Sequence, residues 1–357
     1  MMRLVYLLPM LLLTTAGLAG EQVIETIVAP ATETNRRNTE GDLVVLKDGT
    51  CLLAWSDFYG GARDDSAGRI SAVRSTDGGR TWGPRFTLQE NVGKQNVMSV
   101  SFLRLRSGDI LFFFLLKNSR RDLDCLVCRS TDDGATWSEP ALVTTEAGYY
   151  VMNNARVVQL SSGRILCPMA FTGEVWTASE NFRTLVYYSD DDGRTWRRGR
   201  GLVSCPKRGA MEPGLVELDD GRVLQIIRTQ LGQIWHCHSS DGGDTWTEAA
   251  PWTVAAPEAP STLARTPGRG EFVLIYNPTV RLGTDHSGPR TPLVGALSTD
   301  EGRSWTEPKA IEADLSAHYA YTSLRFHDGR ALVTYYVARG GLSSLKFKSI
   351  PLAWFRE

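Results

Sequence analysis

The stretch STDGGRTW at residues 75–82 decides the fold, because its pattern, Ser-x-Asp-x-Gly-x-(Thr/Ser)-Trp, occurs five times along the chain. Successive copies begin 55, 59, 50 and 59 residues apart. That period is typical of a four-stranded blade of a β-propeller rather than of a helical solenoid. The copies occupy residues 75–82, 130–137, 189–196, 239–246 and 298–305.

Each copy follows an apolar, strand-like run and has the chemistry of a tight turn. The aspartate carboxylate can accept hydrogen bonds from backbone N–H groups ahead of it, and the glycine can adopt a positive φ. The tryptophan can pack back as a large apolar plug. We therefore predict that each copy forms a β-hairpin turn at the outer edge of a blade, with a structural role remote from chemistry.

A second repeated feature, a glycine followed by an apolar strand, counts the blades. It occurs six times, and the last blade lacks the tryptophan motif. We expect the C-terminal run 345–355 to complete that blade by pairing with the N-terminal strand 23–28, because closure removes exposed sheet edges. The sequence thus predicts an all-β fold, a six-bladed β-propeller with five motif hairpins, in one domain over residues 21–357. The glycines are Gly49, Gly108, Gly163, Gly221, Gly270 and Gly329.

Residues 1–20 have the features of a signal peptide and are expected to lie outside the fold. Arg3 precedes an apolar run at residues 4–13, and the small residues at 16–20 offer a cleavage site. A bilayer-spanning helix needs roughly 20 apolar residues, about twice the length of this run, and no later run is long enough. We therefore predict a secreted or periplasmic protein without a membrane span.

Charge and cysteine content exclude several classes of partner. The 39 basic and 40 acidic residues are interspersed and give a net charge of −1, so we expect no face for nucleic acid. Six cysteines permit disulfides in an exported protein, with the connectivity open. Cys125 and Cys128 have the spacing of half a metal site, but their segment reads as a buried strand and no second pair stands at zinc spacing. We expect no metal and no cofactor, and the sequence does not specify an oligomeric state.

Arginines in otherwise apolar or turn-forming segments are candidates for a site at the hub, where the inner strands converge. Arg228 ends the inner-strand-like run 222–228, and Arg290 precedes the strand-like run that begins at Leu293. Arg36 and Arg37 precede the first strand of the first blade, and either can contribute. Guanidinium groups from three blades would form a permanently charged clamp for a carboxylate. Each arginine taken alone is better explained by a structural ion pair.

Glu212 and Tyr321 stand at equivalent places in their blades, and a loop carries two aspartates. A tyrosine hydroxyl near a carboxylate base can become a nucleophile or a strong hydrogen-bond partner. Asp64 and Asp65 lie in the loop 60–68 ahead of the first motif, where one of them could reach the site as a general acid. The simpler alternatives are a packed aromatic side chain for Tyr321 and solvated or capping roles for the loop aspartates.

The motifs resemble those of the sialidase (neuraminidase) superfamily over roughly residues 35–340. Members of that family carry the same repeat, called the Asp box or BNR repeat, on a six-bladed propeller. They also have an arginine before the first strand, a catalytic aspartate ahead of the first box, a glutamate and an arginine in the fourth blade, a third arginine ahead of the fifth box, and a tyrosine in the last blade. The residues at these places, in the same order, are Arg37 or Arg36, Asp64 or Asp65, Glu212, Arg228, Arg290 and Tyr321.

The resemblance implies a glycoside hydrolase that releases a terminal acidic sugar, whose carboxylate lies on its anomeric carbon. A neutral tyrosine nucleophile avoids the repulsion that an anionic nucleophile would meet there. Tyr321 would attack while Glu212 takes its proton, the arginines would hold the substrate carboxylate, and the loop aspartate would protonate the leaving oxygen. Family members often have Tyr-Glu late in the last blade, the glutamate orienting the first arginine, whereas this chain has Tyr-Tyr-Val at residues 335–337.

Two other functions remain open on the sequence. A sialidase-like propeller that binds glycans without cleaving them needs the arginines but not the acid and the nucleophile. A glycosidase of different specificity could use the same scaffold. The joint presence of Tyr321, Glu212 and a loop aspartate favours the hydrolase, with a glycan that bears an acidic terminal sugar as its substrate.

Overall fold

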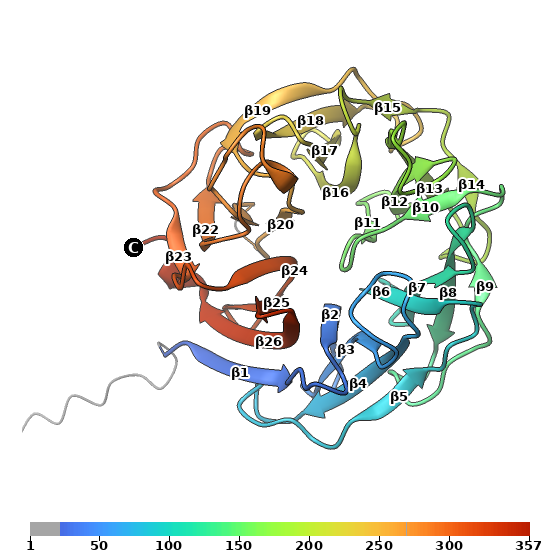
Figure 1. Ribbon diagram of the computed structural model, residues 1–357, viewed down its shortest axis with the longest axis vertical. Helices are drawn as coiled ribbons and strands as arrows, with labels where there is room; N and C mark the ends of the chain where they lie inside the picture. The colour runs from blue at the N-terminus through green and yellow to red at the C-terminus, as the bar shows by residue number, and fades with distance from the viewer. Residues whose placement is uncertain (1–21, 269) are drawn as a thin grey trace, which may run out of the picture.

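The computed structural model describes residues 22–268 and 270–357, which form a ring of six antiparallel blades around a central axis (Figure 1). In each blade the first strand lies nearest to the axis and the last strand lies at the rim. The predicted all-β propeller is confirmed. The predicted signal peptide, residues 1–20, lies outside the described residues. Within the described part of the chain, no helix is long and apolar enough to cross a membrane.

The blades follow one another in chain order, and the inner and outer strands of the third blade are each broken in two. Blade one contains β2 (Arg37–Val45), β3 (Cys51–Phe58), β4 (Arg69–Ser75) and β5 (Phe86–Gln89). Blade two contains β6 (Asn96–Arg104), β7 (Ile110–Lys117), β8 (Leu123–Ser130) and β9 (Ala141–Leu142). Blade three contains β10 (Tyr149–Val151), β11 (Val158–Gln159), β12 (Ile165–Thr172), β13 (Arg183–Ser189), β14 (Arg197–Arg198) and β15 (Val203–Ser204).

The second half of the ring is regular, with two short 3-10 helices, η1 (Asp285–Ser287) and η2 (Leu352–Phe355). Blade four contains β16 (Met211–Glu217), β17 (Val223–Arg228), β18 (Gln233–Ser239) and β19 (Ala250–Ala255). Blade five contains β20 (Thr262–Arg265), β21 (Phe272–Tyr276), β22 (Leu293–Ser298) and β23 (Lys309–Glu312). Blade six contains β24 (His318–His327), β25 (Arg330–Arg339), β26 (Leu342–Pro351) and, from the other end of the chain, β1 (Ile24–Ala29).

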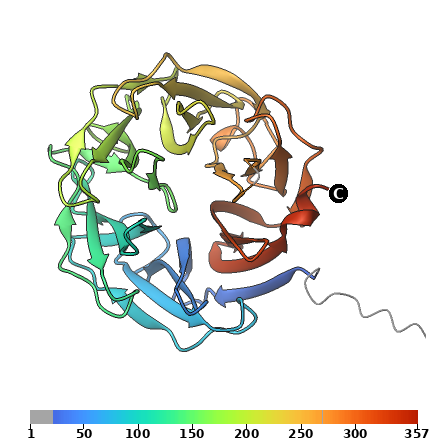
Figure 2. The same cartoon turned by 180° about the vertical axis from the view of Figure 1, so that it is seen from behind.

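The two ends of the described chain close the ring, as the sequence predicts. Strand β1 pairs antiparallel with β26, so the first strand forms the outer edge of the last blade, and both views show it there (Figures 1 and 2). The expected C-terminal strand ends earlier than residue 355, because Pro351 has no amide hydrogen for further pairing and the chain turns into η2.

The Asp boxes form the turns between the third and fourth strands of the first five blades, which confirms that they lie on β-hairpin turns. In the first box, the Ser75 hydroxyl donates to Asp77 at 2.8 Å and accepts from the Gly79 amide at 2.9 Å. The Asp77 carboxylate also accepts hydrogen bonds from the amide and the hydroxyl of Thr81, at 2.9 and 2.6 Å. These bonds join residues of the box itself, and the second box repeats them between Ser130, Asp132, Gly134 and Thr136.

The apolar core lies between adjacent blades, because alternate side chains of each strand face the neighbouring sheet on either side. All five box tryptophans lie in or against this core, and three of them pack against an aromatic ring of the preceding blade. Trp82 packs edge-on against Phe347 with 5.2 Å between ring centroids, and Trp305 packs against Trp252 at 5.5 Å. All six cysteines are buried in this core as free thiols, and Cys125 and Cys128 lie in β8 as expected.

The six predicted hairpin glycines join the first two strands of their blades. Each has a positive φ, between 68° for Gly270 and 98° for Gly108, which an L side chain adopts only with strain. This second repeated feature therefore marks all six blades, including the one without an Asp box.

Candidate active site

A cavity of about 690 Å³ lies at the axis and is lined by residues from every blade. One side of it is charged and carries Arg37, Asp64, Glu212, Arg228 and Arg290. The other side is apolar. That apolar wall is made by side chains of the second to fourth blades and of the loop before β13, among them Met98, Leu115, Leu123, Val151, Met152, Val175, Phe182 and Met211.

The innermost strands present their site residues at β-bulges. The pairing register shifts at Glu40 in β2, at Ser99 in β6, at Glu212 in β16 and at Tyr321 in β24. Each of these four residues has a positive φ, between 39° and 60°. A bulge re-aims a side chain that the regular pleat would direct elsewhere. The equivalent places seen in the sequence for Glu212 and Tyr321 are therefore one recurring bulge within the inner strand.

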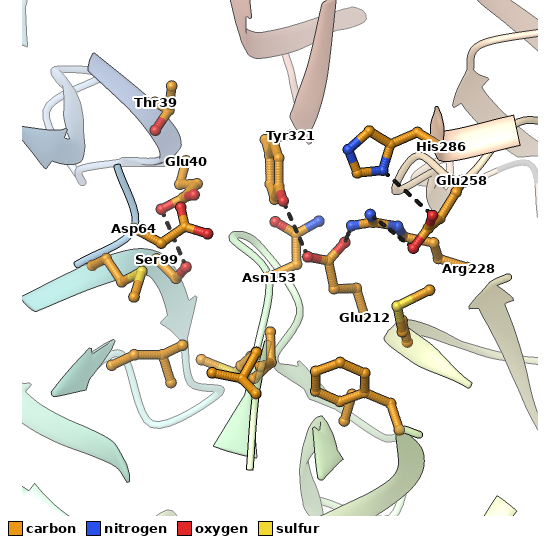
Figure 3. A pocket seen from close by; sticks show the side chains of 18 of the residues that line it. Thr39, Glu40, Asp64, Ser99, Asn153, Glu212, Arg228, Glu258, His286 and Tyr321 are labelled. Atoms are coloured by element: carbon orange, nitrogen blue, oxygen red, sulfur yellow. Dashed lines mark hydrogen bonds and ion pairs between the residues drawn. The ribbon is translucent and has the colours of Figure 1, made fainter. Parts of the chain in front are cut away.

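Tyr321 and Glu212 meet across the axis although they are 109 residues apart. The Tyr321 hydroxyl donates to Glu212 Oε1 at 3.2 Å, and Arg228 Nη1 donates to Glu212 Oε2 at 2.6 Å. Figure 3 shows Glu212 between the tyrosine and the arginine. Glu212 is thus held on one side by a cation and faces a phenol proton on the other, which is the geometry of a base beside a nucleophile.

Burial raises the pKa of the Tyr321 phenol, and the Glu212 carboxylate raises it further, while Arg228 and Arg290 act in the opposite direction. Tyr321 is therefore a neutral phenol at physiological pH. A neutral nucleophile can approach an anionic substrate without charge repulsion, and it needs a base for its proton at the moment of attack.

The three arginines Arg37, Arg228 and Arg290 all line the cavity but differ in their partners. Arg37 pairs with Glu40 at 2.8 Å and with Asp64 at 2.5 Å. Arg228 pairs with Glu212 and, at 3.5 Å, with the buried Glu258. Arg290 has no carboxylate within ion-pair distance among the described residues. Its nitrogens donate instead to neutral acceptors, the Tyr336 hydroxyl at 3.1 Å and the Glu258 carbonyl at 3.3 Å, so its charge is available to an anion.

The loop that carries Asp64 is fixed by two buried side chains of the second blade. Asn96 donates to the carbonyl oxygens of Asp64 and Ser66 at 2.8 and 2.9 Å, and Lys117 Nζ donates to the Asp64 carbonyl at 3.2 Å. Burial tends to raise the pKa of the Asp64 carboxyl, but Arg37 outweighs it and holds that pKa below its usual value. Asp64 is thus an ionised partner of Arg37.

The structure separates the two pairs of alternatives that the sequence left open. Arg36 lies outside the cavity, where its guanidinium is 4.0 Å from Glu33. Asp65 also lies outside and pairs with Arg63 at 3.0 Å. Arg36 and Arg37 are neighbours at the start of β2, where successive side chains point to opposite sides, so only one of them can face the axis. Of these candidates the structure brings Arg37 and Asp64 to the cavity, and not Arg36 or Asp65.

Three residues of the site escaped the sequence analysis. Glu40 accepts from Arg37, so the carboxylate that the family places late in the last blade has a counterpart three residues after the arginine. Tyr336, at the late position itself, bonds Arg290 instead. Glu258 is 1% exposed, and contacts with His286, Arg228 and Arg208 outweigh its burial and lower its pKa to about 2. The only available signal was that Glu40 stands at the bulge position that Glu212 and Tyr321 share.

Fold and site together define a propeller of the sialidase type, with Asp boxes at the rim and an arginine-rich cavity at the hub. A family model described as a BNR repeat-like domain matches residues 49–332. The chain therefore belongs to the BNR repeat-like family, within the sialidase superfamily.

Curated relatives carry the name sialidase but are longer than this chain. The sialidase of Micromonospora viridifaciens is 26% identical over 349 residues, covering 87% of this chain and 51% of that protein. The sialidase of Bacteroides fragilis is 24% identical over 353 residues, covering 86% and 62%. The chain thus spans between about half and three fifths of their length.

Solved structures share the fold at lower identity. A protein of unknown function from Dyadobacter fermentans superposes with a TM-score of 0.76 at 20% identity, covering 93% of this chain and 99% of that one. Trypanosoma rangeli sialidase, in complex with the inhibitor DANA, superposes with a TM-score of 0.74 at 16% identity, covering 92% and 59%. At these identities the comparison shows the propeller fold alone.

Proposed function

We propose that the chain is an exported, exo-acting glycoside hydrolase that removes terminal sialic acid or a related acidic sugar from glycoconjugates. The observation that carries the proposal is the hydrogen bond from Tyr321 to Glu212 inside a cavity that also contains three arginines. Recognition of an anion requires only the arginines, whereas a buried phenol facing a carboxylate base is what covalent catalysis requires.

The proposed reaction begins with an exchange of partners at Arg37. The substrate carboxylate displaces Asp64 from Arg37 and also binds Arg290, whose charge has no carboxylate partner. Asp64, released from the cation that lowers its pKa and placed beside a new negative charge, then takes up a proton more readily. The Asp64 carboxyl is thereby prepared as the acid for the leaving oxygen.

In the first chemical step the Tyr321 oxygen bonds to the anomeric carbon as Glu212 takes the phenol proton. The glycosidic carbon–oxygen bond breaks, and Asp64 gives its proton to the leaving oxygen. Water then attacks the same carbon with Asp64 as base, the tyrosyl bond breaks, and Glu212 returns the proton to Tyr321. Two displacements at one carbon retain the configuration of the sugar.

Hydrolysis of a fluorogenic aryl sialoside tests the proposal. We expect turnover by the wild-type protein and none by Tyr321→Phe, while circular dichroism shows both folded and both bind a carboxylate-bearing sialic acid analogue. Glu212→Gln is the second variant, and it should lose turnover while keeping the fold. A wild-type protein that binds the analogue and hydrolyses no acidic aryl glycoside would be a glycan-binding propeller. Hydrolysis of another acidic glycoside in place of the sialoside would change the substrate that we assign to the enzyme.

A further inference from the structure

A second cavity, of about 490 Å³, lies further along the inner strands and shares no lining residue with the cavity of the candidate active site, the first cavity. Strand β16 passes from one to the other, because Met211 and Glu212 line the first cavity and residues 214–217 line the second. Strand β24 does the same, with Tyr321 in the first and Leu324 in the second. The proposed reaction uses no residue of the second cavity.

Arg156 lines the second cavity and spans the space between several blades. Its amide donates to the Ser101 hydroxyl of blade two at 3.0 Å, whereas its Nη1 donates to the Ser261 carbonyl, ahead of blade five, at 2.9 Å. Gly214 of blade four leaves room for the guanidinium, since a Cβ there would stand 3.0 Å from Nη1. Gly214 and Thr262, the residue after Ser261, both line the second cavity. The guanidinium end of the side chain, and not only its backbone, therefore lies at this cavity.

The guanidinium of Arg156 has one edge without partners. The residue is 3% exposed, and its Nε and Nη2 have no hydrogen-bond partner among the described residues. These two nitrogens direct N–H bonds to the same side of the planar group, which is the arrangement that pairs with the two oxygens of a carboxylate. Within the described chain, no carboxylate lies at ion-pair distance from Arg156, and its Nη1 bonds a neutral carbonyl. Burial lowers the pKa of Arg156 to about 10, which leaves it charged at neutral pH.

The other charged side chains that line the second cavity already have partners. Arg265 pairs with Asp219 at 2.5 Å. Arg325 Nε donates to Asp42 at 3.0 Å. The Glu217 carboxylate accepts a hydrogen bond from a backbone amide at 2.7 Å. Among the described residues, the guanidinium between the blades is therefore the lining charge that lacks a counter-ion, and an isolated buried charge is costly unless a partner compensates it.

Much of the remaining lining is aliphatic. Side chains of blades three to six contribute to it, among them Val158, Leu160, Leu215, Leu263 and Leu324. An inorganic anion would fill a small part of the space and leave these walls in contact with water. A carboxylate attached to an apolar body would neutralise the cation and cover the walls as well. The lining therefore favours an organic carboxylate over a simple ion.

We propose that the second cavity binds a small organic carboxylate with an apolar body, whose two oxygens accept hydrogen bonds from Nε and Nη2 of Arg156 while the aliphatic walls cover the body. Neighbouring side chains screen both nitrogens from water, so the carboxylate reaches them with a change of side-chain rotamer. The inference does not depend on hydrolysis at the first cavity, because the two cavities share no lining residue.

Hexanoate is the probe, and hexanol is its neutral counterpart. Because the first cavity also attracts carboxylates, hexanoate is titrated calorimetrically with and without a saturating sialic acid analogue, and its Kd should be the same in both. Hexanol should bind at least about tenfold more weakly. Arg156→Met, which removes the charge at similar volume, should weaken the binding of hexanoate about 100-fold, the factor for two hydrogen bonds to a charged group, and leave the Kd of the analogue unchanged. Arg290→Met is the reciprocal control, since it should weaken the analogue and not hexanoate.

A second readout does not require Arg156→Met to fold. The Nε–H signal of Arg156 in 15N–1H spectra, assigned by its loss in Arg156→Lys, should move when hexanoate is added and not when hexanol is added. Arg156→Lys keeps the charge but lacks the paired edge, so it should bind hexanoate about tenfold more weakly than the wild type.

Three results would overturn the inference, whether or not the protein hydrolyses sialosides. They are competition between hexanoate and the analogue, equal affinity of Arg156→Met and the wild type for hexanoate, and an Nε–H signal that moves with chloride or phosphate but not with hexanoate. The last result would make this a site for an inorganic anion. An inactive wild type that binds hexanoate as expected refutes the proposed hydrolase and leaves the second site standing.

Discussion

Arg290 offers the sharpest test of how the cavity recognises an anion. Of the three cavity arginines, it is the one whose charge no carboxylate offsets. The perturbation is Arg290→Met. Its present partners are neutral and its bonds long, 3.1 Å to Tyr336 and 3.3 Å to the Glu258 carbonyl, and Nε has no partner. Replacing these acceptors with a substrate carboxylate turns neutral hydrogen bonds into charge-assisted ones.

The magnitude follows from those bonds. Hydrogen bonds to a charged group contribute about 1.5–3 kcal/mol each, so losing a two-pronged contact should cost at least about 3 kcal/mol. That corresponds to a roughly 100-fold weaker Kd for a ligand with a free carboxylate. The methyl ester of the same ligand presents only neutral acceptors, and its Kd should weaken by about tenfold or less. The ratio of the two affinities should therefore fall by at least about tenfold.

Isothermal titration with an unsaturated sialic acid analogue and with its methyl ester measures that ratio. The matched control is Arg120→Met. Arg120 is exposed, lies over the ring of Trp176 and does not itself line the cavity. The control should leave the ratio of affinities unchanged. If Arg290→Met weakens the binding of the acid and of the ester by the same factor, Arg290 shapes the cavity but does not recognise the carboxylate. The reasoning from its free charge is then wrong.

Three further outcomes are expected. Asp64→Asn should lower kcat/KM by about 10²–10⁴-fold for a sugar leaving group but far less for a nitrophenyl leaving group, which needs no proton; equal losses on both substrates would count against an acid role. Ser130→Ala leaves the buried Gly134 amide without its acceptor, which should cost about 1–3 kcal/mol and a few degrees of Tm while kcat per folded molecule is unchanged; a selective loss of kcat would contradict the structural role of the boxes. Hydrogen bonds lower the pKa of three box carboxylates to about 2, against an unfolded value of about 3.9. The stability that these carboxylates contribute is therefore complete above about pH 4 and is lost as the pH falls through 2. A Tm that stays flat between about pH 4 and 2 would refute this prediction. Those carboxylates are Asp77, Asp132 and Asp300.

The scaffold could be predicted from the sequence because its determinants are local. A box closes through bonds between residues no more than four apart, as Asp77 bonds Thr81, and a hairpin glycine needs only its own φ. The boxes repeat in five blades and the glycines in all six, and predicting them needs no knowledge of the neighbouring blade. Even ring closure followed from the absence of a box in the last blade.

The candidate site was only partly predictable, since its contacts join residues far apart in the chain. Arg37 was recognisable as a charge near a strand, but nothing local distinguished it from Arg36. That choice depends on which residue begins β2, and hence on the pleat. Glu40 was not identified because a carboxylate inside a strand reads as an ordinary polar residue until the bulge at that position is known.

The positions of the strained residues explain how one scaffold supports both a stable ring and a cavity of specifically aimed side chains. Glu40, Ser99, Glu212 and Tyr321 adopt left-handed backbone conformations at the hub, each at a cost on the order of 1–3 kcal/mol. Such strain persists only where the surroundings over-determine the structure, and here the rim provides this through self-contained box turns and cores between blades. Because the stabilising turns lie at the rim and the reactive groups on bulges at the axis, substitutions at the hub can change chemistry while the ring stays closed.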